Sequence, residues 1–248
     1  MEENLSIEPE STTPTAHKMS LREWFDNFWY HYKWHSLVAI VLIFALLVCS
    51  LQFCKKEEYD IYIMYAGPYV IGKTTTDGGE AEIESVIASL KRVTKDFDSD
   101  GNISINFANY FYMNNDELAA AGNNINQSFL SSEQKALEGA LELSGYYLCL
   151  ISPVVYETYK GADGGMFMSL SEFSPYVPED AFYAHNAIKL CKTDFSNLPG
   201  INALPEDTLI CIKAPTVFAA KSKEHKEYIS RAKETLVNLL KTSVKPLE

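Results

Sequence analysis

Residues 59–65 read YDIYIMY, and this strand-like run begins an alternation that decides the fold. A helical pattern follows at 80–93, where one face collects the apolar positions Ile83, Val86, Ile87, Leu90 and Val93. A second strand-like run, ISINFANYFY, covers 103–112. Strands that alternate with amphipathic helices are typical of α/β proteins. We therefore expect an α/β domain whose sheet is mostly parallel and flanked by helices.

The alternation continues to the end of the chain. Ser131 is expected to cap the next helix, with Gln134 reaching back to it and Gly145 ending it. The segment 161–183 is rich in Gly, Ser and Pro, and is long enough for a binding loop or an inserted flap. The remaining elements are expected as helices at 131–144, from 153 and at 221–241, and as strands at 146–151, 184–191 and 208–213.

The most apolar segment lies at 34–54 and carries no formal charge. At about 1.5 Å per helical residue it spans roughly 31 Å, close to the hydrocarbon thickness of a bilayer. A core helix would keep a polar stripe, and the apolar part of a cleaved signal peptide is only about 7–15 residues long. We therefore expect a juxtamembrane and transmembrane helix at 20–54. A disordered acidic tail at 1–19 precedes it, and a soluble α/β domain at 55–248 follows.

All three tryptophans, Trp24, Trp29 and Trp34, come just before or at the start of the apolar segment. Amphipathic rings favour the headgroup zone of a bilayer. A stacking platform for nucleic acid would need a basic groove, whereas the chain has a net charge of −12. We therefore interpret these residues as an aromatic belt. The positive charges on the two sides of the helix nearly balance, so charge alone does not fix the orientation.

The soluble domain is acidic, with 18 Lys and Arg against 27 Asp and Glu in residues 55–248. This balance argues against nucleic acid and anionic lipid as partners, and it is compatible with cations. Cys149, Cys191 and Cys211 lie in strand-like apolar runs, and the chain has no C-x-x-C motif. We expect buried free thiols and no disulfide framework.

The segment 67–74 reads GPYVIGKT, which matches the phosphate-binding pattern G-x-x-x-x-G-K-[ST] at Gly67, Gly72, Lys73 and Thr74. That chemistry also needs a helix that starts at the Gly-Lys-Thr, so that its N-terminus faces the phosphates. Here TTDGG follows, a turn composition, and the helical pattern begins only near 80. We interpret the segment as a loop after the first strand, and keep nucleotide binding as an alternative.

The segment 96–104 reads DFDSDGNIS and is a better candidate for a site. Calcium binds six to eight oxygen ligands, and carboxylates at positions 1, 3 and 5 of a tight loop with Gly at position 6 converge on one point. Phe107 stands at position 12, where a bidentate Glu is expected, so a distant Asp or Glu would have to complete the site. An ordinary acidic turn stays open as the alternative. The candidate calcium ligands are Asp96, Asp98, Asp100, Asn102 and Ser104.

Four stretches carry a resemblance to known proteins: LREWFDNFWYHYKWH, the apolar helix after it, KKEEYDIYIMYAGP and DFDSDGNISINF. In these the chain resembles a loose group of uncharacterised single-pass membrane proteins of anaerobic Gram-positive bacteria. The resemblance covers about the first 110 residues and implies an extracytoplasmic α/β domain tethered to the cell membrane. More faintly, the order of strands and helices is similar to one lobe of extracellular solute-binding proteins, with 152–159 near the ligand crevice.

Three functional hypotheses follow. The leading one is a binding or interaction module without catalytic activity, anchored in the cell membrane by 34–54 and facing outward, with calcium as a candidate stabilising ion. Its partner would be an extracellular protein or a small ligand. The second is a nucleotide-binding regulator or NTPase that uses the loop at 67–74. The third is a divergent solute-binding lobe with a crevice near 152–159 and 161–183.

Overall fold

The computed structural model describes residues 20–54, 59–72, 79–121, 126–143, 145–161 and 165–242. The expected disordered tail at 1–19 lies outside the described residues. The chain divides into two compact units, Met1–Glu58 and Tyr59–Glu248.

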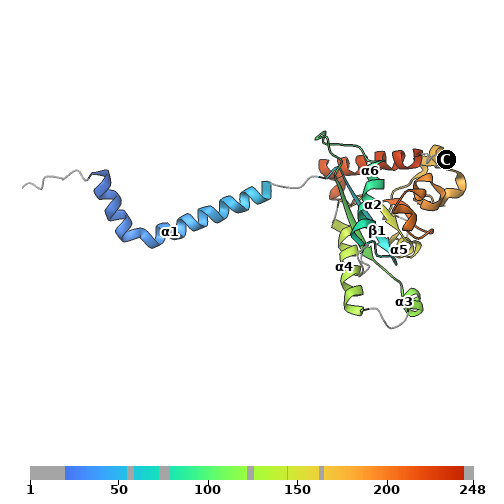
Figure 1. Cartoon of the computed structure of the whole chain (residues 1–248), viewed down its shortest axis with the longest axis horizontal. Coiled ribbons are helices and arrows are strands. Elements are labelled where there is room, and N and C mark those ends of the chain that lie inside the picture. Colours follow the sequence, from blue (N-terminus) through green and yellow to red (C-terminus); the bar gives the residue numbers. More distant parts are fainter. Residues whose placement is uncertain are drawn as a thin grey trace, which may run out of the picture. The chain divides into compact units, whose positions relative to one another are not determined.

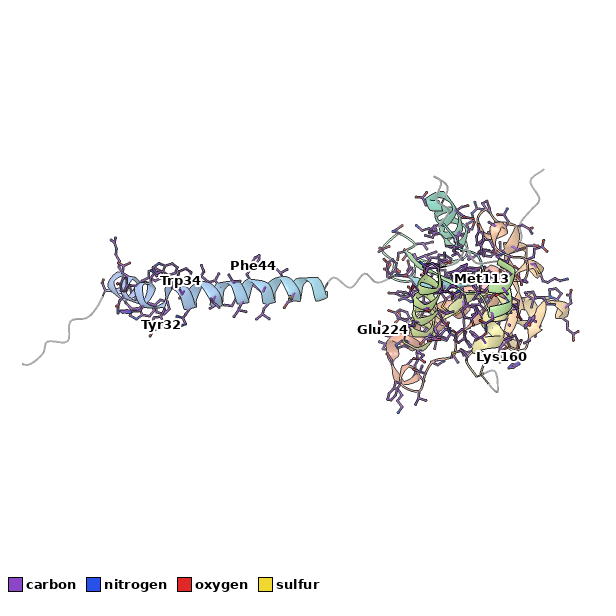
Figure 2. The ribbon with its side chains drawn as sticks, turned by 90° about the horizontal axis from the view of Figure 1, so that it is seen from below. Tyr32, Trp34, Phe44, Met113, Lys160 and Glu224 are labelled. Carbon is purple, nitrogen blue, oxygen red and sulfur yellow. The ribbon has the colours of Figure 1, made fainter. Side chains whose placement is uncertain are left out.

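The first unit contains one 34-residue helix, α1 (Leu21–Cys54), which is drawn in blue in Figure 1. Its stretch Trp24–Ser50 is long and apolar enough to cross a membrane, and none of that stretch is buried. Figure 2 shows the side chains of Tyr32, Trp34 and Phe44 projecting outward from the helix. A long apolar helix is therefore present where the sequence predicts one.

The second unit is built on one six-stranded sheet with the strand order β2-β1-β3-β6-β5-β4. Strands β2, β1 and β3 run parallel to one another, whereas the pairs β3–β6, β6–β5 and β5–β4 are antiparallel. The strands are β1 (Ile61–Gly67), β2 (Ile105–Phe111), β3 (Leu148–Ile151), β4 (Phe182–Ala184), β5 (Ala187–Lys189) and β6 (Leu209–Ile212). The α-helices are α2 (Gly79–Lys91), α3 (Asn115–Ala121), α4 (Gln127–Leu143), α5 (Pro153–Tyr159) and α6 (Lys223–Lys241).

The α/β class is confirmed, but the sheet is mixed and not mostly parallel. A parallel pair needs a crossover of a dozen or more residues, usually a helix, and α2 and α4 provide these between β1, β2 and β3. Between β3 and β4 the described chain forms no helix longer than the short α5 and 3-10 turns. A two-residue turn at His185 and Asn186 joins β4 to β5 as a hairpin, so these strands return antiparallel.

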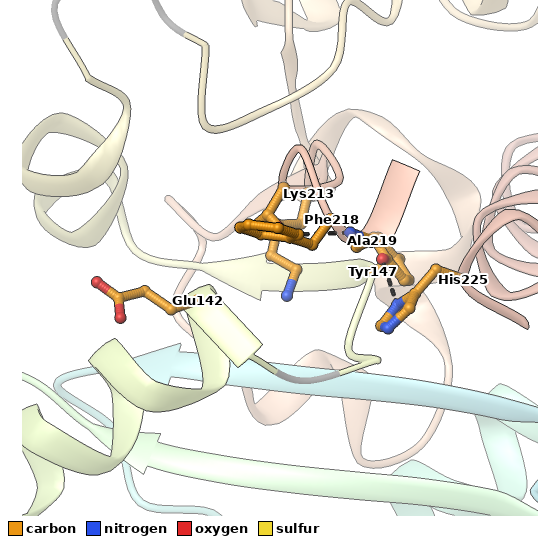
Figure 3. Close-up of a pocket in the computed structure, with 7 residues that line it drawn as sticks. Glu142, Tyr147, Lys213, Phe218, Ala219 and His225 are labelled. Carbon is orange, nitrogen blue, oxygen red and sulfur yellow. Dashed lines mark hydrogen bonds between the residues drawn. The ribbon is translucent and has the colours of Figure 1, made fainter. Parts of the chain in front are cut away.

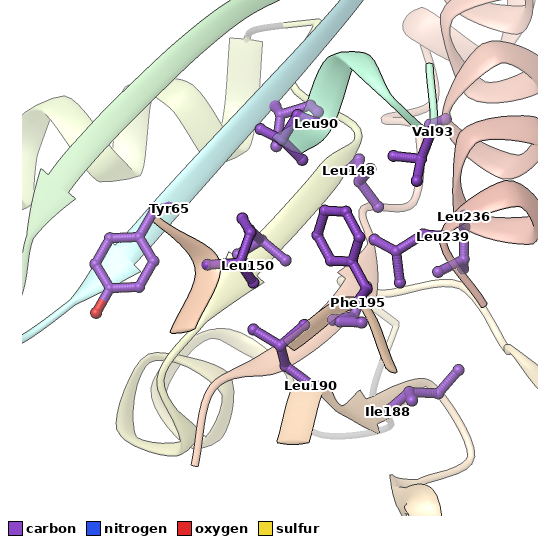
Figure 4. Close-up of a cluster of buried hydrophobic side chains, with 14 of the residues drawn as sticks. Tyr65, Leu90, Val93, Leu148, Leu150, Ile188, Leu190, Phe195, Leu236 and Leu239 are labelled. Carbon is purple, nitrogen blue, oxygen red and sulfur yellow. The ribbon is translucent and has the colours of Figure 1, made fainter. Parts of the chain in front are cut away.

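Both faces of the sheet are covered, which explains the near-continuous apolar runs of its central strands. On one face, shown in Figure 4, Tyr65, Leu148, Leu150 and Ile188 of the strands pack against helices and 3-10 turns. The covering residues include Leu90 of α2, Phe195, and Leu236 and Leu239 of α6. On the other face Met64, Cys149, Ile151 and Cys211 pack against α4 and α5, through Leu137, Leu141, Val155 and Tyr156.

Several local expectations need correction. The helix α4 starts at Gln127, because the side chain of Asn126 accepts hydrogen bonds from the backbone N–H groups of Ser128 (2.9 Å) and Phe129 (3.3 Å); Ser131 is not its cap. Cys149 and Cys211 are buried free thiols as expected, but Cys191 is exposed, because β5 ends at Lys189 and a 3-10 turn follows.

The segment expected as a loop or flap is part of the core in its described portion. Phe167, Leu170 and Phe173 are each at most 3% exposed. Phe167 also forms an isolated bridge with Lys213, which extends the sheet locally beyond β6. Residues 162–164 lie outside the described residues. The described part of this segment therefore packs on the sheet through these residues and does not form an open flap.

Gly200 provides a test of how the 3-10 segments pack on α2. Its φ is +79°, and a Cβ there would lie 2.6 Å from the backbone N of Val86 in α2. Gly101 has a similar φ of +87° with nothing within 4 Å. We expect Gly200→Ala to lower the free energy of unfolding by about 1–3 kcal/mol more than Gly101→Ala, because only Gly200 adds a backbone clash to the unfavourable φ. Urea unfolding of the two variants measures this difference, and equal losses would contradict the packing.

Candidate functional site

The acidic loop between α2 and β2 has the shape that its spacing predicts. The carboxylate of Asp96 accepts hydrogen bonds from the backbone N–H groups of Asp100 (3.2 Å) and Gly101 (2.8 Å), so the loop curls around the first carboxylate. Ser99 and Gly101 have positive φ values, +61° and +87°, which allow the tight curl. Asp98 likewise accepts from the N–H of Asp100, at 3.0 Å.

A buried carboxylate from another strand holds this loop in place. Asp60, just before β1, is 0% exposed. Its Oδ1 accepts from the N–H groups of Phe97 (2.6 Å) and Asp98 (3.3 Å). Its Oδ2 accepts from the N–H (2.8 Å) and the hydroxyl (3.1 Å) of Ser104. The desolvation of a buried carboxylate is thus offset by four hydrogen bonds, and the loop is tied to the start of β1.

Three carboxylates converge here. One oxygen each from Asp60, Asp96 and Asp98 lie within 4.8 Å of one another. With calcium–oxygen distances of about 2.3–2.6 Å, oxygens at this separation can share one ion. Asp96 and Asp98 belong to the predicted ligand set, and Asp60 is a distant carboxylate of the kind that the incomplete loop motif would need.

The rest of the predicted ligand set is placed differently. Asp100 is not part of the converging group, and its Oδ1 accepts from the N–H of Asn102 at 2.7 Å. The Ser104 hydroxyl lies beside Asp60 and contacts it directly. The side chain of Asn102 is exposed. The structure therefore brings two of the five predicted residues together with Asp60, and places Ser104 next to them.

The electrostatics of the group favour a positive charge. The N–H of Gly101 is the largest of the effects that lower the pKa of Asp96. For Asp98 the N–H of Asp100 lowers the pKa, but desolvation, the hydrogen bond with Asp96 and the charges of Asp100 and Asp60 outweigh it, so the pKa is raised. Neighbouring carboxylates raise one pKa in this way because they cannot all ionise at low energy. A bound cation would relieve the same repulsion.

Sequence inspection missed Asp60 because it precedes the loop by 36 residues. Only the pairing of β1 with β2, with Ile61 opposite Ile105, brings Asp60 opposite Ser104. The backbone N–H of Asp60 donates to the Ser104 carbonyl at 3.0 Å, which continues the ladder by one position. The available signal was an Asp directly before the first predicted strand, together with the expectation that this strand pairs with the one following the acidic loop.

The glycines of the phosphate-binding pattern have local structural reasons. A Cβ at Gly67 would lie 2.7 Å from the Tyr65 hydroxyl, and Gly72 has a φ of +76°. Glu82 of α2 faces this loop: it accepts from the N–H of Gly72 (3.3 Å) and from the hydroxyl of Tyr69, whose pKa this hydrogen bond raises to about 12. A carboxylate at this position would repel a phosphate. Lys73 and Thr74 lie outside the described residues, so nucleotide binding stays a prediction.

A polar pocket beside α6, shown in Figure 3, was not predicted from the sequence. The Tyr147 hydroxyl and Nδ1 of His225 lie 2.7 Å apart. Lys213 is 2% exposed, and its Nζ donates to the carbonyl of Ala140 (3.1 Å) in the last turn of α4. The cavity measures about 170 Å³ and is lined by Glu142, Tyr147, Lys213, Thr216, Phe218, Ala219 and His225. The only sequence signal was a lysine directly after an apolar strand.

The polar groups of this pocket mainly stabilise the fold. Burial lowers the pKa of Lys213, while its ammonium compensates a carbonyl at the C-terminus of α4, where a cation is favourable. The nearby Cys149 is fully buried, and burial raises the pKa of its thiol to about 12. A thiol in that state is protonated at neutral pH and is a poor nucleophile.

The crevice expected for a solute-binding lobe is only partly formed. The Ser152 side chain caps α5 by accepting from the N–H of Val155 at 3.3 Å. A pocket of about 420 Å³ lies beside this helix, lined by Asn114, Pro153, Val154, Glu157 and Thr158. None of its lining residues comes from the segment 165–183, so the two segments expected to form one crevice do not share this pocket.

Comparisons of the chain with protein-family models, with curated proteins and with solved structures find no match.

The contribution of Asp60 to the stability of the fold can be tested without any metal. We expect Asp60→Asn to lower the free energy of unfolding by about 2–4 kcal/mol in the presence of EDTA, since three backbone N–H groups lose a charged acceptor. Asp194→Asn, an exposed aspartate on a 3-10 turn, should change it by less than about 0.5 kcal/mol. Urea unfolding compares the two. A loss for Asp60→Asn no larger than for Asp194→Asn would show that the loop does not depend on this carboxylate.

Proposed function

We propose that this chain is a membrane-anchored, extracytoplasmic binding or interaction module without catalytic activity, and that calcium stabilises its α/β unit at Asp60, Asp96 and Asp98. The observation that carries the proposal is the convergence of these three carboxylates within 4.8 Å. Hard oxygen ligands from carboxylates are what calcium prefers. The ion would stabilise the fold of the loop and would not form a reaction centre, because all three carboxylates already accept hydrogen bonds from backbone N–H groups.

The anchoring part of the proposal is supported by α1. Its stretch Trp24–Ser50 can cross a bilayer by length and composition, and it is not buried. The aromatic residues that precede the most apolar part are exposed as well, as an interfacial belt requires. An exposed helix with this much apolar surface is stable in lipid, whereas in water it would associate.

The outward orientation is supported by the chemistry of the loop and by the family resemblance. Extracellular calcium modules bind with dissociation constants of about 10⁻⁴–10⁻³ M, which suits incomplete or partly exposed sites. Asp96 and Asp98 are accessible from solvent while Asp60 is buried, so such a site would be of the weak type. A site of that affinity is filled only where calcium is abundant.

The non-catalytic part is supported by the state of the groups that could react. Lys213 is engaged with the carbonyl of Ala140, and Cys149 is a buried, protonated thiol. The carboxylates of the acidic loop serve as acceptors for backbone N–H groups. These contacts fix side chains and do not prepare a nucleophile or a base.

Calcium should stabilise the full-length protein in detergent. At about a hundred times its dissociation constant, it should add about 2.7 kcal/mol, which corresponds to roughly 5–10 °C for a domain of this size. The three tryptophans lie in 20–54, so unfolding of the α/β unit is best followed by near-ultraviolet circular dichroism of tyrosines. Magnesium should do less, because it requires near-octahedral geometry at shorter distances.

The double variant Asp96→Asn with Asp98→Asn should lose this calcium shift, whereas Asp194→Asn should keep it. The double variant is expected to remain folded in EDTA, because Asp60 still holds the loop. If calcium shifts the melting temperature of all three proteins equally, or of none, the metal site is wrong.

Cys191 allows the orientation to be tested in the native chain. Its side chain is exposed, whereas Cys149 and Cys211 are buried. We expect a membrane-impermeant maleimide to label the protein on intact cells, and Cys191→Ser to remove the label. Labelling that requires permeabilised cells would place the α/β unit in the cytosol and would overturn the extracytoplasmic part of the proposal.

A further inference from the structure

The described part of the α/β unit carries a strongly exposed apolar tip. Val217 and Phe218 are 74% and 88% exposed, whereas the next most exposed large hydrophobic side chains among the described residues of this unit, Tyr176 and Tyr183, are 40% and 41% exposed. The tip lies between β6 and α6 in the chain, and Phe218 also lines the pocket of Figure 3. An aromatic ring and a neighbouring valine exposed to this degree form a candidate interaction surface.

Hydrogen bonds within the turn fix the conformation of the tip. The N–H of Ala220 donates to the carbonyl of Thr216 at 2.8 Å, and the N–H of Ala219 faces the Thr216 hydroxyl at 3.3 Å. The N–H of Lys221 donates to the carbonyl of Phe218 at 3.1 Å. These bonds close a compact turn in which the side chains of Val217 and Phe218 remain largely exposed.

The chain leaves β6 toward the tip at the same end of the sheet at which it enters β1. Ile63 of β1 lies opposite Leu148 of β3, and Leu148 lies opposite Ile212 of β6. Because β6 runs antiparallel to β1, the chain after Ile212 emerges where β1 begins. Only four positions, 55–58, separate α1 from Tyr59 in the sequence, and the five steps from Cys54 to Tyr59 can span at most about 18 Å. The tip therefore lies at the end of the sheet at which the chain enters β1 after α1.

The charge around the tip also fits a bilayer surface. Lys221, Lys223 and Lys226 are exposed and outnumber the acidic residues Glu224 and Glu142 near the tip, while Glu227 forms an ion pair with Arg231. An aromatic ring flanked by lysines is the composition that binds at the headgroup boundary, where the ring is half dehydrated and ammonium groups meet phosphates. This local excess of positive charge contrasts with the acidic balance of the whole domain.

We propose that Val217 and Phe218 insert into the headgroup region of the membrane that holds α1, and that Lys221, Lys223 and Lys226 bind anionic headgroups there. The proposal rests on the membrane anchoring of the proposed function. It adds a second contact, which would hold the α/β unit against the bilayer surface and fix which of its faces remain open to a partner.

Fluorescence quenching tests this contact in the full-length chain. The α/β unit has no tryptophan, so Phe218→Trp places a single reporter at the tip. The protein is reconstituted into vesicles of phosphatidylcholine and phosphatidylglycerol with brominated acyl chains. Tyr183→Trp is the matched control, because Tyr183 is an exposed ring whose hydroxyl lies 3.3 Å from Glu157 of α5, and α5 follows the opposite end of β3.

The wild-type protein provides the internal standard, since Trp24, Trp29 and Trp34 report on α1 alone. We expect the emission added by Phe218→Trp to be quenched at least twofold more than the emission added by Tyr183→Trp. Equal quenching of the two would overturn the tip contact, whatever the wild-type protein shows. Weak quenching of the wild type would instead contradict the anchoring by α1.

A second copy of the chain is the competing occupant of the tip. If it covers Val217 and Phe218, the emission added by Phe218→Trp should shift to the blue with rising protein concentration in detergent without lipid. That outcome would overturn the membrane contact. A spectrum independent of concentration, together with quenching by brominated lipid, supports it.

Discussion

The carboxylate of Asp60 is buried just before β1. A buried carboxylate requires hydrogen-bond donors, and these donors fix the arrangement of the elements around it. The donors are backbone N–H groups of Phe97, Asp98 and Ser104, which come from the loop that leads into β2. On the other side, Arg231 of α6 donates to the carbonyls of Tyr59 (3.3 Å) and Asp60 (3.2 Å). The first two strands, the acidic loop and the last helix are thus fixed to one another at this point. The same bonds hold Asp96 and Asp98 close together, which creates the excess of negative charge that a cation would neutralise.

Periodicity predicted the elements that are buried most regularly. Helices α2 and α6, and strands β1, β2, β3 and β6, lie within a few residues of their expected bounds, because their apolar residues face the two core layers. The direction of a strand has no such signature, since the side chains of parallel and antiparallel strands alternate alike. The antiparallel half of the sheet depends on a two-residue turn and on 3-10 turns that follow β5, and neither shows a period. The 184–191 run therefore looked like one strand, although the chain turns at Leu190.

The sequence could predict those residues of the candidate site that lie close together in the chain. The spacing of Asp96 and Asp98 within one loop indicated a cation site, and both residues belong to the converging group. Asp60 could not be found this way, because only the β1–β2 register brings it near. Lys213 was missed for the same reason: its partner Ala140 is 73 positions away. Conversely, the glycine pattern at 67–74 looked like a ligand site, yet Gly67 leaves room for the Tyr65 hydroxyl and Gly72 adopts a positive φ.

The acidic composition of the domain argued against anionic lipid as a partner, whereas the proposed tip contact requires it. The acidic composition and the proposed contact with anionic lipid are compatible, because surface charges in salt solution interact only over short distances. In the sheet order, three strand spacings separate β2, next to the acidic loop, from β6, next to the tip. At about 4.8 Å per spacing this is about 14 Å, whereas the screening length at physiological salt is about 8 Å. The lysines near Phe218 therefore interact with a bilayer almost independently of Asp96 and Asp98. A calcium ion at the acidic loop would weaken the remaining repulsion between the loop and the same anionic surface.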